Sequence, residues 1–196
     1  YPWRFLPIVF CLFRLYAIQS KNQEADESIK KALLFKNIDP SAYYLNGKYI
    51  FTKYKRDSIE SVLYNFKKAS ELGNSKGEDY YNAIKLIEAY RKAFLEMDEK
   101  KMVELNFQDA MIDYYGSLDK AQIEISEIFN QFKQNKIKLN DLDYFIPDQI
   151  FTTSNNSKLA KFRILIWANS KKEEIQMPDN LLLISIDGAN WYLMSF

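Results

Sequence analysis

The side chains that most often carry chemistry in proteins are scarce in this chain of 196 residues. It has no histidine, which removes the commonest general base and the commonest metal ligand. Its one cysteine, Cys11, lies in the apolar run FLPIVFCLF, with no charged residue closer than Arg14. A buried, unreactive thiol is therefore favoured over a thiolate nucleophile. With one cysteine there is no disulfide framework, so the cysteine content leaves the redox compartment open.

Carboxylates occur in pairs, but their spacing is not that of a metal site. Calcium loops need carboxylates at regular steps within one loop, and zinc sites need imidazoles or paired thiols. Neither pattern is present in the acidic pairs Asp98-Glu99, Asp141/Asp143 and Glu173-Glu174. The five glycines form no phosphate-binding loop. We therefore expect no metal and no cofactor.

Composition indicates a globular protein without a field of one charge sign. Apolar residues make up 47% of the chain and charged residues 27%, which is ordinary for a folded domain. The formal net charge is +1, and basic residues alternate with acidic ones. Such a surface does not gather nucleic acid, so we expect no nucleic-acid partner.

The most strongly patterned stretch is residues 79–105, which predicts a long amphipathic helix. Its apolar residues recur at steps of three and four, the spacing of one helix face. They are Ala83, Ile84, Ile87, Tyr90, Ala93, Phe94 and Met97. Helical patterns precede this stretch and strand patterns follow it, so we expect it to join two modules, residues 1–78 and residues 79–196.

The first module contains a weak internal repeat. Residues 24–35, 41–52 and 57–72 have helical patterns, and Gly73-Asn74 ends the last of them. IKKAL at 29–33 recurs as FKKAS at 66–70, and SAYY at 41–44 recurs as EDYY at 78–81, both shifted by 37 residues. A period of this length indicates stacked helix pairs.

The residues of this repeat resemble tetratricopeptide repeats of the SEL-like type. Ala42, Leu45, Gly47 and Tyr49 are similar to the first helix of that family, and FKKASELGN is similar to its second helix and turn. The resemblance implies a helical scaffold whose concave face holds a peptide or protein partner. The alternative is that these helices only pack onto the rest of the chain.

Beyond the long helix the period changes from helix to strand. Residues 98–104, 107–115 and 118–133 predict helices, and four short runs predict strands. The runs are residues 141–153, 159–168, 181–187 and 191–196, separated by the loops TSNNS, NSKKEE and MPDN and by the turn Asp187-Gly188-Ala189-Asn190. The last two runs predict a hairpin in which Gly188 takes a positive φ. The fold class is therefore α+β, helices followed by a curved antiparallel sheet.

Helices followed by a sheet that ends in LLLISIDGANWYLMSF resemble the nuclear transport factor 2-like superfamily, with its cystatin-like α+β cone. The resemblance implies that the cone holds a small apolar ligand or serves as a homodimer interface. It also implies where chemistry would lie, because enzymes of this superfamily use an Asp, a Tyr or a His in the cone. The ligand-binding candidates are Tyr90, Asp113, Tyr114, Tyr144, Arg163 and Trp191, and Asp109 and Tyr115 are further candidates for acid–base chemistry.

None of these candidates belongs to a catalytic motif. Tyrosines at helical spacing usually pack in a core, and an Asp at the start of a short helix usually caps it. We therefore predict a non-enzymatic binding protein and name no catalytic residue. The alternative is a small-molecule enzyme or carrier that uses Asp and Tyr groups in the cone for proton abstraction beside a carbonyl.

Two further expectations concern the ends of the chain. We expect residues 1–17 to form a packed helix, with the core of a signal peptide as the alternative. The chain does not begin with methionine, and both resemblances favour a bacterial cell envelope, with the cytoplasm as the alternative.

In the closing hairpin, we expect one face to meet the helices and Trp191 to be a buried anchor. That face comprises Ile184, Ile186, Trp191 and Leu193.

Overall fold

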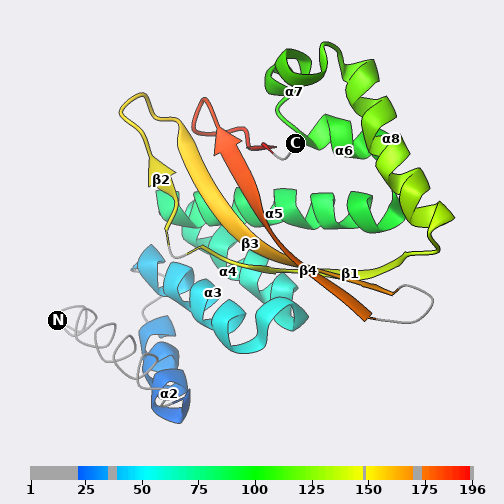
Figure 1. The fold of residues 1–196 in the computed structure, drawn as a ribbon. Coiled ribbons are helices and arrows are strands. Elements are labelled where there is room, and N and C mark those ends of the chain that lie inside the picture. The colour runs from blue at the N-terminus through cyan, green and yellow to red at the C-terminus, as the bar shows by residue number, and fades with distance from the viewer. Residues whose placement is uncertain (1–21, 35–38, 148, 170–173, 195–196) are drawn as a thin grey trace. The chain divides into compact units, whose positions relative to one another are not determined.

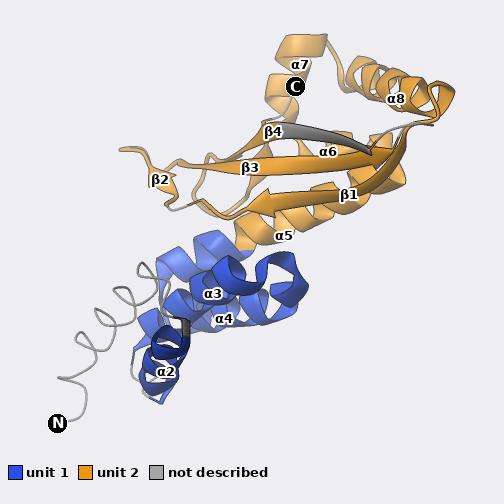
Figure 2. Cartoon of the chain, turned by 60° about the horizontal axis from the view of Figure 1, so that its bottom comes forward, with its two compact units in different colours: residues 1–81 blue, residues 82–196 orange. Residues whose placement is uncertain are grey.

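A computed structural model describes residues 22–34, 39–147, 149–169 and 174–194. The chain divides into two compact units, Tyr1–Tyr81 and Asn82–Phe196, which Figure 2 shows in separate colours. The expected helix over residues 1–17 and Cys11 lie outside the described residues. None of the described helices combines the length and the apolar character that crossing a bilayer requires.

Unit 1 is helical, and its helix ends follow local sequence signals. Asp39 caps the N-terminus of α3 (Pro40–Tyr54) by accepting a hydrogen bond from the Ser41 amide at 2.8 Å, and Pro40 occupies the first helical position. α4 (Ile59–Glu71) ends at a C-terminal cap, in which Gly73 has φ +90° and the amide of Asn74 donates to the carbonyl of Ala69 at 2.9 Å. The elements are α2 (Asn22–Leu33), α3 (Pro40–Tyr54), the short 3₁₀ helix η2 (Lys55–Ser58), α4 (Ile59–Glu71) and the start of α5 (Ser75–Glu96).

The core of unit 1 is aromatic, and it depends on two close approaches at glycine. Phe66 of α4 stacks on Tyr80 of α5, with ring centroids 5.3 Å apart. A Cβ on Gly47 would lie 3.0 Å from the Phe66 ring, and a Cβ on Gly77 would lie 2.6 Å from the Cβ of Ala69. The helices of unit 1 are thus packed through positions where no side chain fits.

The long helix is shorter than the pattern predicts. α5 ends at Glu96, because Met97 takes φ +54° and Asp98 starts a new helix by accepting a hydrogen bond from the Lys101 amide at 2.9 Å. The apolar period continues through this break, so periodicity alone cannot show it. The expectation of one helix over residues 79–105 is corrected to α5 followed by α6 (Glu99–Leu105), and α6 matches the separate short helix predicted over residues 98–104.

Unit 2 continues with helices and then a curled antiparallel sheet, a half-barrel, so the predicted α+β class is confirmed. After α6 come α7 (Gln108–Tyr115) and α8 (Leu118–Gln134). The strands are β1 (Lys138–Phe145), β2 (Phe151–Thr152), β3 (Lys158–Asn169), β4 (Glu174–Ser185) and β5 (Tyr192–Leu193). Their order is β1-β3-β4-β5, with β2 also paired to β3 (Figure 1).

Two expectations about β4 are wrong. The MPDN segment is not a loop: Pro178 pairs with Leu165 inside the β3–β4 ladder. Proline is compatible with β4 there because β5 pairs only with Leu183 and Ile184, which leaves the other side of that stretch free of a described strand.

The inward face of β4 is the other correction. Leu181, Leu183 and Ser185 are buried, whereas Ile186 is 47% exposed and Ile184 is half-buried. Since side chains alternate between faces, the face predicted for Ile184 and Ile186 is one residue out of register. The hairpin itself is confirmed, with Leu183 opposite Leu193 and Gly188 at φ +78°.

The part of α5 in unit 2 lies against the sheet. The Tyr144 hydroxyl of β1 donates a hydrogen bond to Glu88 Oε1 at 2.7 Å, and Arg91 forms an ion pair with Asp141. The turn between α6 and α7 is joined to the end of the sheet by the Phe107 amide, which donates to the Leu193 carbonyl at 2.8 Å. The first two contacts place this part of α5 against β1, and the third holds the turn between α6 and α7 at the end of the sheet (Figure 1).

Candidate functional site

A cavity of about 170 Å³ lies within unit 2, between the helices and the inner face of β4. We call it the half-barrel cavity. The helices contribute Tyr90 and Phe94 from α5, Met102 from α6 with Asn106 just after it, Met111 and Tyr115 from α7, and Ile125, Ile128 and Phe129 from α8. The sheet contributes Asp179 and Leu181 from β4. Most are apolar or aromatic, as in small-molecule sites.

The shape of this cavity follows from helix packing. Tyr90 and Phe94 are four residues apart on α5 and stack with centroids 5.9 Å apart. Phe94 in turn meets Phe129 of α8 edge to face at 6.1 Å. Behind them, Val103, Met111 and Ala121 form a small buried cluster that joins α6, α7 and α8. The four helices α5 to α8 are therefore held as walls of the cavity, and β4 of the sheet supplies the remaining wall.

Two polar groups mark one side of the half-barrel cavity. The Tyr90 side chain is 6% exposed, and its hydroxyl has no hydrogen-bond partner within the described residues. Burial raises the pKa of Tyr90, and the nearby Asp179 carboxylate raises it further. Tyr90 is thus a neutral phenol that can donate or accept a hydrogen bond.

Asp179 is the charged residue of the lining, and its position is unusual. It pairs with Ile164 in the ladder and shares the inward face with Leu181 and Leu183, which are 1% and 0% exposed. Its own side chain is exposed, so it lies at the mouth of the cavity. Among the described residues it forms no ion pair.

Asp179 was missed by sequence reasoning. The MPDN segment predicts a loop, where a carboxylate carries no information about a face. Asp179 stands two residues before Leu181, so it shares the face of Leu181, but this position is informative only once the strand and its inward face are known. A charge at an inward position of a strand indicates that this face reaches solvent there, and for Asp179 the place is the mouth of the cavity.

The structure brings two of the predicted residues to the half-barrel cavity, Tyr90 and the further candidate Tyr115. Asp113 and Tyr114 are exposed on α7, with Tyr114 71% exposed, and do not line it. Asp109 is likewise exposed. Successive residues of a helix point in different directions, so Tyr115 of α7 can face the cavity while its neighbours Asp113 and Tyr114 face solvent.

The remaining candidates lie elsewhere in unit 2. Tyr144 is buried, with its hydroxyl bound to Glu88. Arg163 is exposed, with its guanidinium 4.6 Å from the centre of the Phe145 ring. Trp191 is 8% exposed, does not line the cavity, and its indole N–H has no hydrogen-bond partner within the described chain.

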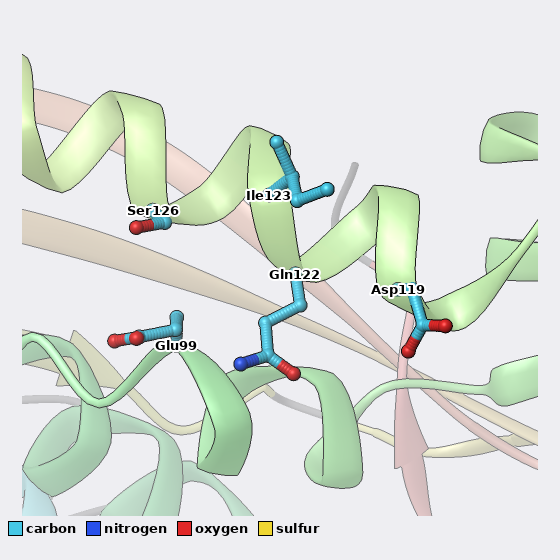
Figure 3. Close-up of a pocket in the computed structure, with 5 residues that line it drawn as sticks. All are labelled: Glu99, Asp119, Gln122, Ile123 and Ser126. Carbon is cyan, nitrogen blue, oxygen red and sulfur yellow. The ribbon is translucent and has the colours of Figure 1, made fainter.

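A larger hollow, of about 290 Å³, opens between α6 and α8. Figure 3 shows the Gln122 side chain reaching from α8 towards α6 and Glu99, while Ile123 points away from α6. The lining is Glu99, Asp119, Gln122, Ile123 and Ser126, which provides two carboxylates and no aromatic wall. Glu99 and Gln122 are half-buried, whereas Asp119 and Ile123 are exposed. The half-barrel cavity therefore has the better composition for a small organic ligand.

Neither site has the donors of a metal centre. In the described ranges, no group of three or more Cys, Asp or Glu is arranged to hold a metal ion. Comparison of the chain with models of protein families, with curated proteins and with solved structures found no match. We therefore infer the function from the geometry of the chain's own residues.

Proposed function

We propose that the protein is a non-enzymatic binding protein whose half-barrel cavity holds a small, largely apolar ligand. The observation that supports this is an apolar cavity of about 170 Å³ whose wall includes Tyr90, a largely buried tyrosine with no hydrogen-bond partner for its hydroxyl among the described residues. Cavities of roughly 150 Å³ lined by Leu, Ile and Phe stay dry and bind benzene. The expected ligand is therefore of single-ring size.

We propose in addition that unit 2 is a nuclear transport factor 2-like cone and unit 1 a SEL-like repeat module that holds a protein or peptide partner. A sequence shift of 37 residues aligns α2 with α4 and the start of α3 with the start of α5. Five pairs of aligned residues are buried in both copies. The pairs are Ala25 and Val62, Ser28 and Asn65, Ile29 and Phe66, Ala32 and Ala69, and Tyr43 and Tyr80.

An enzyme or carrier that uses Asp and Tyr groups in the cone is the alternative. Asp179 and Tyr90 are the Asp and Tyr that lie together at the half-barrel cavity. The raised pKa keeps Tyr90 protonated, so little phenolate is available to act as a general base, and Asp179 is exposed at the mouth rather than enclosed beside a bound substrate. Binding without turnover is the use that this arrangement supports best.

Titration calorimetry with benzyl alcohol tests the binding proposal, with two matched variants on α8. Ile125 lines the half-barrel cavity and is half-buried, so Ile125→Trp should fill the space and abolish binding. Ile123 is 56% exposed and lies outside the cavity, so Ile123→Trp should bind like the unchanged protein. Equal binding by both variants, or no saturable binding by the unchanged protein, would overturn the proposal.

Use of the cone for homodimerisation is the other prediction for unit 2. It is tested by the molar mass from light scattering across a hundredfold range of concentration. A dimer that is unaffected by filling the cavity with Ile125→Trp would show that the two uses of unit 2 are independent. A mass of one chain at every concentration would refute dimerisation.

A further inference from the structure

The half-barrel cavity has an acidic group at one end, Asp179, which forms no ion pair among the described residues and accepts a hydrogen bond from the Asn180 amide at 2.7 Å. Its negative charge bears on what the cavity can bind. The cavity lining contains one negative side chain, Asp179, and no positive one. Two cations on neighbouring elements of unit 2 have other partners: Arg91 of α5 binds Asp141, and Lys101 of α6 binds Glu104 at 2.8 Å. A bound anion would meet the Asp179 carboxylate without a compensating charge.

Tyr90 provides a second polar contact on the same side. Its hydroxyl has no hydrogen-bond partner among the described residues, and its side chain is 94% buried (6% exposed) on the wall of the cavity. A hydroxyl that lines a cavity without a protein partner is available to a ligand, which can form the missing hydrogen bond. The oxygen of a neutral phenol accepts a hydrogen bond from a donor such as an ammonium group.

The aromatic wall adds a third feature. Tyr90, Phe94 and Phe129 present ring faces and edges to the same space, with Tyr90 and Phe94 stacked at an interplanar angle of 19°. Ring faces attract cations, and the attraction is larger where water is excluded. The cavity thus combines an apolar interior, an aromatic wall and a carboxylate at its mouth.

From this arrangement we infer that the ligand is a small organic amine, bound with its ring or alkyl part among Met102, Met111 and Phe129 and its ammonium group between Asp179 and the Tyr90 hydroxyl. This inference rests on the proposed function, since it names the class of ligand for the same cavity. Charge-assisted hydrogen bonds to a carboxylate are about twice as strong as neutral ones, so the ammonium group should dominate selectivity.

Calorimetric titration with three ligands of equal size separates the inference from the proposed function. Benzylamine is a cation, benzyl alcohol is its neutral counterpart, and benzoate is an anion. We expect benzylamine to bind at least about tenfold more tightly than benzyl alcohol, a difference of about 1.4 kcal/mol, and benzoate to bind least. Asp179→Asn should remove the advantage of benzylamine and leave the affinity for benzyl alcohol unchanged.

Asp119→Asn is the matched control, because Asp119 is an exposed carboxylate on α8 that lines the other hollow. It should preserve the advantage of benzylamine. Equal affinity for benzylamine and benzyl alcohol, or an advantage that survives Asp179→Asn, would overturn the amine inference while the binding proposal stands. Absence of binding by all three ligands would overturn the binding proposal and the inference together.

Discussion

The ring of Phe94 on α5 meets the ring of Phe129 on α8 edge to face, with centroids 6.1 Å apart and an angle of 67° between their planes. The two side chains are 8% and 3% exposed, and both line the half-barrel cavity. This contact fixes α8 against α5, so the cavity exists only while the two rings remain packed. The first prediction tests this dependence.

Phe129→Ala should destabilise the protein by about 3–5 kcal/mol, as truncations of buried aromatic residues do. The cause is the loss of buried area and of the contact with Phe94. Urea unfolding followed by circular dichroism measures the effect, with Phe151→Ala as control, since Phe151 is 55% exposed. A loss no larger than that of the control would contradict the assignment of Phe129 to the core.

Trp191→Ala should cost about 3–5 kcal/mol as well, because the side chain is 92% buried (8% exposed). The structure gives Trp191 no place in the lining of the cavity, so the affinity for benzyl alcohol should be unchanged under conditions where the variant is folded. An unchanged unfolding midpoint and slope, together with weakened binding of benzyl alcohol, would instead show that Trp191 contacts the ligand and does not stabilise the core.

Gly77→Ala distinguishes helix propensity from helix packing by its sign. In a free helix, alanine would be more stable than glycine by roughly 0.5–1 kcal/mol. Here the added Cβ would lie 2.6 Å from the Cβ of Ala69 and 3.0 Å from the Phe66 carbonyl oxygen, which forces α4 and α5 apart. We expect a net loss of about 1–3 kcal/mol in the free energy of unfolding.

The exchange variant Gly77→Ala with Ala69→Gly is the control for this prediction. It restores space at the contact, so it should recover part of the lost stability, whereas Gly77→Ala with the distant Ala42→Gly should not. A single variant Gly77→Ala more stable than the parent protein in thermal unfolding would contradict close packing of α4 on α5.

Asp187 gives the closing hairpin a dependence on pH. Backbone amides of Ala189 and Asn190 donate to Oδ1 at 2.9 and 2.8 Å, the Asn190 side chain donates to Oδ2, and the Ser185 hydroxyl donates to Oδ1. These bonds lower the pKa of Asp187 well below its ordinary value of 3.8, with the backbone amides as the main cause. The ionised carboxylate therefore stabilises the folded chain.

The pKa is depressed in the folded state, so this stabilisation is complete above the unfolded-state pKa and is lost as the pH falls through the folded-state pKa. Asp187→Asn should lower stability at pH 7, and the difference from the unchanged protein should shrink as the pH falls below about 4. Asp113→Asn, which removes one carboxylate at an exposed position on α7, is the matched control. A difference that is the same at every pH would refute the role of the charge.

The closing hairpin also shows how far sequence reasoning reached. The turn and the positive φ of Gly188 followed from the Asp-Gly step, because few residue pairs support that geometry. The inward face did not follow, because LLLISI is apolar at nearly every position and the buried residue at its end is the polar Ser185. Alternation cannot assign a face when both faces are apolar.

The candidate site was predicted only where a helix carried it. Tyr90 lies on the apolar face of α5, and that face is well patterned, so its inward position could be read from the sequence. Asp179 could not, because Pro178 favours a loop unless one knows that β4 lacks a second neighbour there. The partners of a cavity wall come from distant segments, and only the fold brings them together.

Binding in the half-barrel cavity is tested most directly by methyl resonances during titration with benzyl alcohol. Met102, Met111, Ile125 and Leu181 line the cavity, whereas Ile123 lines the hollow between α6 and α8. We expect saturable shifts of the methyl resonances of the four cavity residues at one common dissociation constant, with no shift of the Ile123 methyl resonances. Shifts centred on Ile123, or no saturable shift at the four cavity residues, would contradict binding in the half-barrel cavity.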